Sequence, residues 1–212
     1  MRRRIRYLIA GYMTLLTQLA GTRMASATFW GGSWPYSSGS NSYQLLYLPY
    51  VNQCGSDSHI CPYIGSAAGV WNNASAPPNL YSAGSGKFSI GLSSNIPYDG
   101  ITYIYGNGVP SGPQDCSSTC YGSGNYTSAN IYMRYTSMDG YSSSINQSLI
   151  AHEMGHVIGL GHADENNPGN CPSIMYHNTV NDSRFRSNPT GYDVWNMNTL
   201  YRNTRWSANY SC

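Results

Sequence analysis

The sequence predicts one small domain of the α/β class. Its 212 residues suffice for a single domain with a sizeable core, and they contain neither an internal repeat nor a linker between domains. Short apolar segments bounded by Gly and Pro indicate strands, and three longer stretches have the spacing of helices. Along the chain the order is strand, helix, strands, helix, a tight turn and a last helix.

The elements can be assigned in chain order. An extended arm rich in Gly, Ser and aromatic residues is expected over Thr28–Ser42, and a long loop with a CxxxC pattern over Gly106–Gly124. Pro77-Pro78 ends the first helix, and Ser144 or Asn146 is a suitable N-cap for the second. The predicted strands cover residues 43–51, 87–92, 101–105 and 130–135, and the predicted helices cover residues 64–74, 144 or 146 to 158, and 191–201.

The first 27 residues have the pattern of a secretory signal peptide. Four arginines among residues 2–6 form a basic start, a moderately apolar stretch runs to Gly21, and Ala25-Ser26-Ala27 fits a cleavage site. The stretch is too short and too polar for a strong membrane span, although a retained membrane anchor is the alternative. We therefore expect a leader over residues 1–27 and a secreted, extracellular domain over residues 28–212.

The charge balance bears on the partners. Five of the 11 basic residues precede residue 28, which leaves 6 basic against 9 acidic residues in the mature domain. This balance gives no reason to expect a nucleic-acid partner. We also expect no membrane contact once the leader is removed, and a monomer.

Six cysteines follow the cleavage site, and an even number in a secreted chain implies disulfides. Six cysteines allow 15 connectivities. Pairing between near neighbours suggests Cys54–Cys61 and Cys116–Cys120, which leaves Cys171 with Cys212. The alternative is a zinc site built of cysteines, although the sequence has no CxxC pair.

The motif that carries chemistry is HEMGHVIGLGH at residues 152–162, of the form HExxHxxGxxH. His152 and His156 lie four residues apart and therefore face one side of a helix, where both can reach one zinc ion. Glu153 lies roughly 100° round the same turn, where a general base for a zinc-bound water belongs. Gly159 lets the chain leave the helix, and His162 returns as third ligand. Three nitrogen ligands and one open position are typical of a catalytic zinc site; the alternative is a buried helix whose histidines are satisfied by hydrogen bonds.

This motif, followed thirteen residues after His162 by Met175 in the sequence CPSIMY, resembles the metzincin metallopeptidases. It is most similar to the matrixins. Snapalysin-like bacterial enzymes also place a cysteine shortly before the methionine, but their third ligand is Asp where this chain has His162. The resemblance covers residues 43–204. It implies an α/β domain of the α+β type, with a mixed twisted sheet, an active-site helix, a Met-turn and a C-terminal helix.

The resemblance also implies roles for residues beyond the motif. Met175 and its turn would support the zinc ligands from beneath, and Asp193 would accept hydrogen bonds from that turn. For Asp193 the alternative is an acidic residue favoured by the helix dipole. His177 stands where astacins place a tyrosine that touches zinc, which makes it a candidate cleft residue; the alternative is an exposed loop histidine.

Calcium is a weaker expectation than zinc. Asp57, Asp99, Asp115 and Asp139 could contribute to a calcium site, but turn chemistry explains them as well.

The sequence therefore predicts a secreted zinc endopeptidase in which Glu153 acts as general base on protein or peptide substrates. The substrate is expected to pair with an edge strand, placed within Asn130–Tyr135. Two alternatives stay open: a zinc-bearing binding protein or toxin without peptidase activity, and an amidase or aminopeptidase on the same scaffold.

Overall fold

A computed structural model describes residues 32–34, 47–74, 79–107, 124–163, 170–176, 183 and 185–202. The predicted leader, the CxxxC cysteines, Asp115, His177 and Cys212 lie outside the described residues. None of the helices within the described ranges is long and apolar enough to cross a membrane.

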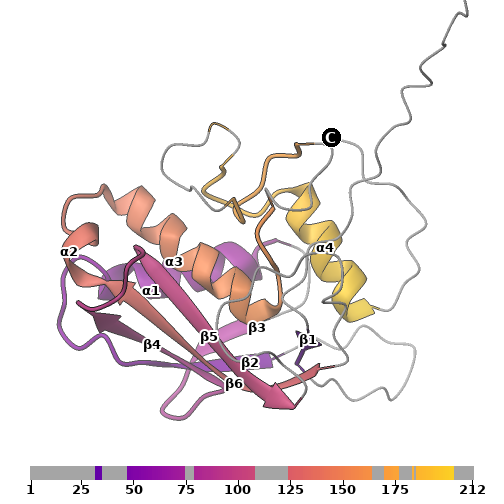
Figure 1. Ribbon diagram of the computed structural model, residues 1–212, viewed down its shortest axis with the longest axis horizontal. Coiled ribbons are helices and arrows are strands. Elements are labelled where there is room, and N and C mark those ends of the chain that lie inside the picture. The colour runs from indigo at the N-terminus through magenta and orange to yellow at the C-terminus, as the bar shows by residue number, and fades with distance from the viewer. Residues whose placement is uncertain are drawn as a thin grey trace, which may run out of the picture.

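In the part of the chain that the structure describes, six strands form one mixed sheet at the base of the molecule (Figure 1). The strand order is β1, β6, β4, β2, β3, and β5 pairs with β6. β5 runs antiparallel to β6, whereas every other pair is parallel. The strands are β1 (Gly32–Ser33), β2 (Tyr47–Asn52), β3 (Asn79–Ser82), β4 (Phe88–Ser93), β5 (Gly100–Asn107) and β6 (Gly124–Arg134).

The sheet order corrects the prediction of the edge strand. Asn130–Arg134 belongs to β6, which lies between β4 and β5 and is therefore interior. Within the described residues β5 pairs only with β6, so β5 is the strand at this edge of the sheet. The backbone of β6 has no edge to offer a peptide, because its hydrogen bonds are already made to neighbours on both sides.

The described ranges also contain four helices: α1 (Cys61–Asn72), α2 (Tyr135–Met138), α3 (Ser143–Ile158) and α4 (Gly191–Arg202). α1 and α3 lie on the same face of the sheet, and α4 lies beyond the end of α3 (Figure 1). The mixed α/β class, the active-site helix and the C-terminal helix are confirmed.

Helix boundaries differ from the prediction at two places. α1 begins at Cys61, where Pro62 occupies the first turn. The N-cap of α3 is Ser142, whose hydroxyl accepts a hydrogen bond from the Ile145 backbone N–H. Asn146, one of the two expected caps, is instead buried and donates to the carbonyls of His59 and Met138.

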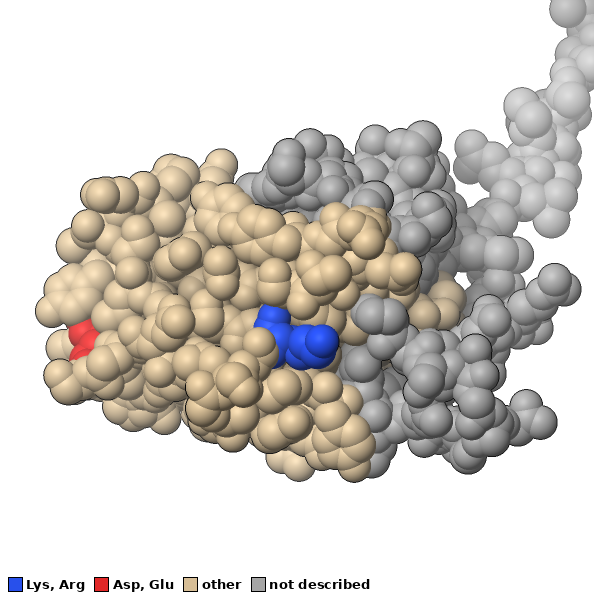
Figure 2. All heavy atoms as spheres, turned by 90° about the horizontal axis from the view of Figure 1, so that it is seen from below, with Lys and Arg blue, Asp and Glu red and all other residues tan. Residues whose placement is uncertain are grey.

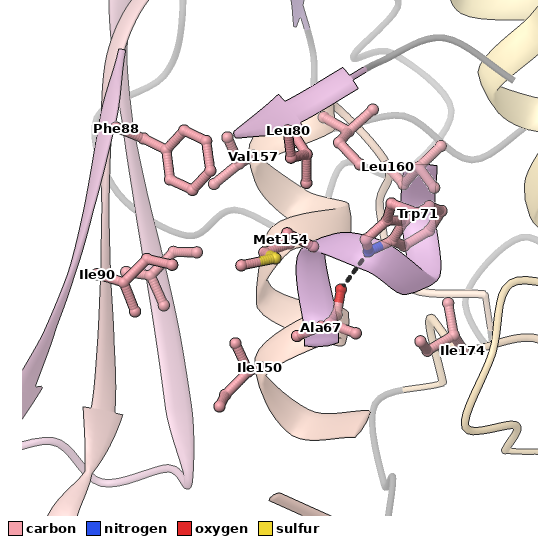
Figure 3. Packing of buried hydrophobic residues seen from close by; sticks show 14 of the residues in the cluster. Ala67, Trp71, Leu80, Phe88, Ile90, Ile150, Met154, Val157, Leu160 and Ile174 are labelled. Atoms are coloured by element: carbon pink, nitrogen blue, oxygen red, sulfur yellow. Dashed lines mark hydrogen bonds between the residues drawn. The ribbon is translucent and has the colours of Figure 1, made fainter. Parts of the chain in front are cut away.

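The core lies between the sheet and the helices. From Ser148 to Ile158 every residue of α3 is buried, including the polar residues of the motif. Met154 and its neighbours on α3 point toward Phe88 and Ile90 of β4 (Figure 3). On the other side Trp71 of α1 packs on α3, and its indole N–H donates to the Ala151 carbonyl at 2.7 Å (Figure 3).

Charged side chains are sparse on the surface. Seen from below the view of Figure 1, Lys, Arg, Asp and Glu occupy only small patches among uncharged residues (Figure 2). This follows from a composition with only 9% charged residues.

Candidate metal centre and active site

Three imidazoles converge at the end of α3. His152 and His156 lie one turn apart with ring centroids 4.8 Å from each other. Gly159 ends the helix in the left-handed conformation at φ 109°, which a side chain would disfavour. The chain then turns back, so that the ring of His162 lies 4.7 Å from that of His156 and 5.4 Å from that of His152.

The orientation of the rings is set by backbone carbonyls. The Nδ1–H of His152 donates to the Ile174 carbonyl at 2.8 Å, and that of His156 donates to the Leu160 carbonyl at 2.8 Å. Such bonds select the tautomer that leaves Nε2 for a metal.

The three rings fit a zinc ion. The Nε2 atoms of His156 and His162 are 3.1 Å apart, close to the ~3.3 Å expected for two nitrogens on one tetrahedral zinc at ~2.0–2.1 Å. One ligand atom from each ring lies within 4.8 Å of the others. The donor set and its spacing therefore suit zinc, which favours imidazole nitrogen.

Glu153 lies beside this cluster and is almost fully enclosed. Its side chain is 7% exposed, and Thr102 of β5 donates a hydrogen bond to Oε2 at 2.6 Å. Burial raises the pKa of Glu153 to about 7, against the opposing effects of the Thr102 hydrogen bond and the charge of His162. A dication held by the neighbouring imidazoles would lower this pKa by favouring the carboxylate.

The turn that contains Met175 packs directly beneath α3. A Cβ at Gly155 would meet the Met175 sulfur, as well as Met175 Cε at 3.0 Å and Trp71 Cζ2 at 2.9 Å. Glycine between the two histidines therefore lets the Met-turn approach the helix closely. The Met175 carbonyl accepts from the Ala163 N–H at 2.7 Å, which ties the turn to the segment that follows His162.

Asp193 links α4 to the same turn. Its buried carboxylate accepts from the Ser173 hydroxyl and from the backbone N–H of Ile174 at 3.2 Å and Thr190 at 2.7 Å. Burial raises its pKa, and these hydrogen bonds oppose the rise. These are the contacts with the Met-turn that the resemblance implied.

The end of α3 is held by two residues that the sequence does not single out for this purpose. The Trp34 indole donates to the Val157 carbonyl at 2.7 Å, and the Tyr201 hydroxyl donates to the Ile158 carbonyl. Both groups satisfy carbonyls at a helix C-terminus that have no partner within the helix. In the sequence, Trp34 is distinguished only by its place in the aromatic-rich arm, and Tyr201 only as the last residue of the predicted helix 191–201.

The remaining predicted residues have other partners. Cys54 and Cys61 form the predicted disulfide. Their sulfurs are therefore not thiolates for a second zinc site. Cys171 is also disulfide-bonded, and its partner lies outside the described residues. Asp57 makes local contacts and accepts from the backbone of His59 and Ile60. Asp99 and Asp139 have partners that are distant in sequence: Asp99 accepts from Tyr141, and Asp139 pairs with His59.

Comparison with protein families decides the class. The family described as dual-action HEIGH metallo-peptidase, peptidase family M57, matches residues 82–193. The chain belongs to this family. The five letters of the family description differ from residues 152–156, HEMGH, only at Met154. The protein is a metzincin-like zinc metallopeptidase, and therefore a hydrolase.

Solved structures with a similar fold include three of low identity. High choriolytic enzyme 1, a hatching-enzyme zinc-protease from Oryzias latipes (Medaka fish), is 14% identical at a TM-score of 0.47, over 80% of this chain and 94% of that one. Myroilysin is 14% identical at 0.46, over 82% and 91%. The ECX AB5 holotoxin in its GM1-bound form is 14% identical at 0.46, over 78% and 85%. Among curated proteins none matches the chain.

Proposed function

We propose that the protein is a secreted zinc endopeptidase in which His152, His156 and His162 hold the metal and Glu153 is the general base. The observation that carries this proposal is the convergence of three carbonyl-oriented imidazoles beside one enclosed carboxylate. A buried carboxylate that is not itself part of the imidazole cluster is placed to move protons rather than to bind the metal.

The protein's own residues supply the proton transfers. A bound zinc ion polarises a carbonyl oxygen and lowers the pKa of a coordinated water. Glu153 accepts a proton from the attacking water and delivers it to the leaving amine. The enclosed position of the carboxylate supports this role, because the low-dielectric surroundings strengthen its interaction with a proton.

The substrate would bind in extended conformation along β5. This strand is the edge of the sheet beside α3, and Thr102 of β5 contacts Glu153 directly. A peptide that adds to the edge of β5 would therefore pass the base and the imidazoles. In strand addition of this kind the hydrogen bonds are made mainly to the peptide backbone. Because these groups are present all along a chain, such binding suits cleavage inside a chain.

Secretion rests on the leader pattern and on the cysteines. Cys54 and Cys61 form a disulfide, and Cys171 is disulfide-bonded as well. Disulfides persist in oxidising compartments and are rare in the cytosol.

The test uses the Glu153→Ala variant and two substrates. Internally quenched peptides with blocked N-termini should be cleaved by the wild type and not by the variant, while both retain one zinc per molecule by elemental analysis. Loss of zinc from the variant would contradict the role of Glu153 as a base that is not a ligand. Cleavage restricted to peptides with a free amino terminus would show an aminopeptidase instead.

A further inference from the structure

We propose that β5 positions the catalytic base, through the hydroxyl of Thr102 and the absence of a side chain at Gly100. The inference rests on the proposed function of Glu153. In this proposal β5 aligns both the substrate and the Glu153 carboxylate, which transfers the proton.

Thr102 fixes one oxygen of the carboxylate. Its side chain is buried, and its Oγ1 lies 2.6 Å from Glu153 Oε2 and 3.1 Å from the Glu153 carbonyl oxygen. A hydroxyl has one proton, and the shorter contact to the charged acceptor is the stronger of the two. In the part of the chain that the structure describes, no other group donates to this carboxylate, so Oε1 is left for proton transfer.

Gly100 forms the wall behind the same side chain. A Cβ at this position would lie 2.7 Å from Glu153 Cγ, 2.8 Å from Oε1 and 2.9 Å from Cδ. The backbone of Gly100 does not adopt a positive φ, so space rather than conformation requires glycine. Gly100 and Thr102 are two residues apart on a strand and therefore face the same side, toward α3.

Together the two residues restrict the Glu153 side chain to one arrangement. The hydroxyl holds Oε2, and the strand backbone blocks the volume into which Oε1 could swing. A carboxylate held in this way is seldom in a rotamer from which it cannot accept the proton. The rate of the chemical step is therefore higher, whereas substrate affinity is unchanged. The alternative explanation is that Thr102 does not position the Glu153 carboxylate. Its buried hydroxyl would then donate to the Glu153 carbonyl only because a buried donor needs an acceptor.

The experiment separates these explanations with paired substitutions. Thr102→Val keeps the shape and removes the hydroxyl, and Thr102→Ser keeps the hydroxyl. Gly100→Ala introduces the clash with Glu153, and Gly91→Ala is its control, since a Cβ at Gly91 on β4 would meet no atom closer than 3.9 Å. For each variant we would measure zinc content, melting temperature, and kcat and KM on a blocked quenched peptide.

The expected result is a loss in kcat alone. Thr102→Val should lower kcat about tenfold with KM within about twofold and one zinc retained, whereas Thr102→Ser should stay within about threefold of wild type. Gly100→Ala should lower kcat by at least about tenfold, and Gly91→Ala should not. A crystal structure of zinc-loaded Thr102→Val should show the Glu153 carboxylate displaced from its wild-type position.

Three outcomes would overturn the inference alone, and a fourth would overturn it together with the proposed function. One is a Thr102→Val enzyme with wild-type kcat while Glu153→Ala is inactive, which would leave the proposed function intact. Another is equal loss in Thr102→Val and Thr102→Ser, which would indicate a packing role. Should Thr102→Val fail to fold, wild-type kcat in Gly100→Ala would decide against the inference. Activity retained by Glu153→Ala would refute the proposed function itself, and the inference with it.

Discussion

Gly155 lies on α3 between His152 and His156. Its replacement by alanine should destabilise the protein, although glycine-to-alanine changes inside a helix usually stabilise one. Replacing a glycine inside a helix by alanine normally stabilises a protein by about 1 kcal/mol, because alanine loses less backbone entropy. At Gly155 the added Cβ would meet Met175 and Trp71, both of which are buried. We therefore expect Gly155→Ala to destabilise the protein.

The magnitude follows from the contacts. The Cβ would lie 2.9 Å from Trp71 Cζ2 and 3.0 Å from Met175 Cε, and closer still to the Met175 sulfur. Extra volume in a packed core costs about 1–3 kcal/mol, and contacts to two large side chains favour the upper part of that range. After the gain in helix propensity, the expected net loss is about 1–2 kcal/mol, or a melting temperature lower by about 2–8 °C.

The assay is thermal unfolding of the metal-free protein beside a matched control. Gly65→Ala lies on α1 at an exposed position where a Cβ would meet nothing within 4 Å, and it should raise the melting temperature by about 2–4 °C. Gly155→Ala should also weaken zinc binding in competition with a chelator, because Met175 follows the Ile174 carbonyl that orients His152. A melting temperature for Gly155→Ala that rises as much as that of the control would refute this reasoning.

Three other perturbations have expected outcomes. Asp193→Asn should lower the free energy of unfolding by about 1–3 kcal/mol, measured by denaturant titration. An amide has one acceptor oxygen where the carboxylate has two, and the Ser173 hydroxyl and the backbone N–H groups of Ile174 and Thr190 all donate to that carboxylate. An unchanged free energy of unfolding would mean that these bonds are dispensable. Reduction of Cys54–Cys61, which lie 7 residues apart, should cost about 2 kcal/mol by loop entropy, and an unchanged melting temperature of a Cys54→Ser, Cys61→Ser double variant would contradict it. Zinc should be released in acid, at a pH below the ~6.5 of a free imidazole, because only neutral imidazoles bind it and bound zinc opposes their protonation; full occupancy by dialysis at low pH would argue against imidazole ligation.

The parts of the fold that sequence predicts well are those with strong local signals. α3 and α4 were predicted nearly to their ends, because apolar spacing and motif extend over several turns. β3 was missed because its four residues follow Pro77-Pro78 with little alternation. β3 is a strand because it pairs in parallel with β2. On α1, the Asn72 side chain also donates to the Leu80 carbonyl and accepts from the Leu80 N–H. α2 is a single turn, too short for a periodic signal.

The order of the strands in the sheet, unlike the position of a helix along the chain, has no local signal in the sequence. The edge strand was predicted within Asn130–Tyr135, yet this segment belongs to β6 up to Arg134, and β5 flanks β6 as its antiparallel neighbour. Alternation along a strand indicates which side chains face the core, but not which strand lies next to which. The first half of β6, which begins at Gly124, is mostly polar, and it is paired with β5 as far as Asn125 and with β1 at Gly124 and Asn125.

In the site, the residues that would touch zinc are readable from sequence because they are close along one helix and its exit turn. The groups that orient them are not. The Ile174 and Leu160 carbonyls are backbone atoms with no residue signature, and Thr102 contacts Glu153 across 51 positions of sequence. Nothing in the pattern of residues distinguishes this threonine from others on a half-buried strand.

These supports connect the metal centre to distant parts of the fold. The Ile174 carbonyl of the Met-turn orients His152, and the Asp193 carboxylate on α4 accepts a hydrogen bond from the backbone of the same turn. Trp34 and Tyr201 donate to the last carbonyls of α3, directly before the turn that leads to His162. A ligand that binds only the folded arrangement stabilises every contact on which that arrangement depends. Zinc binding should therefore stabilise the packing of α4 and of Trp34 on α3, and loss of those contacts should weaken zinc binding by the same free energy. The metal centre is thus thermodynamically coupled to elements that contribute no ligand to it.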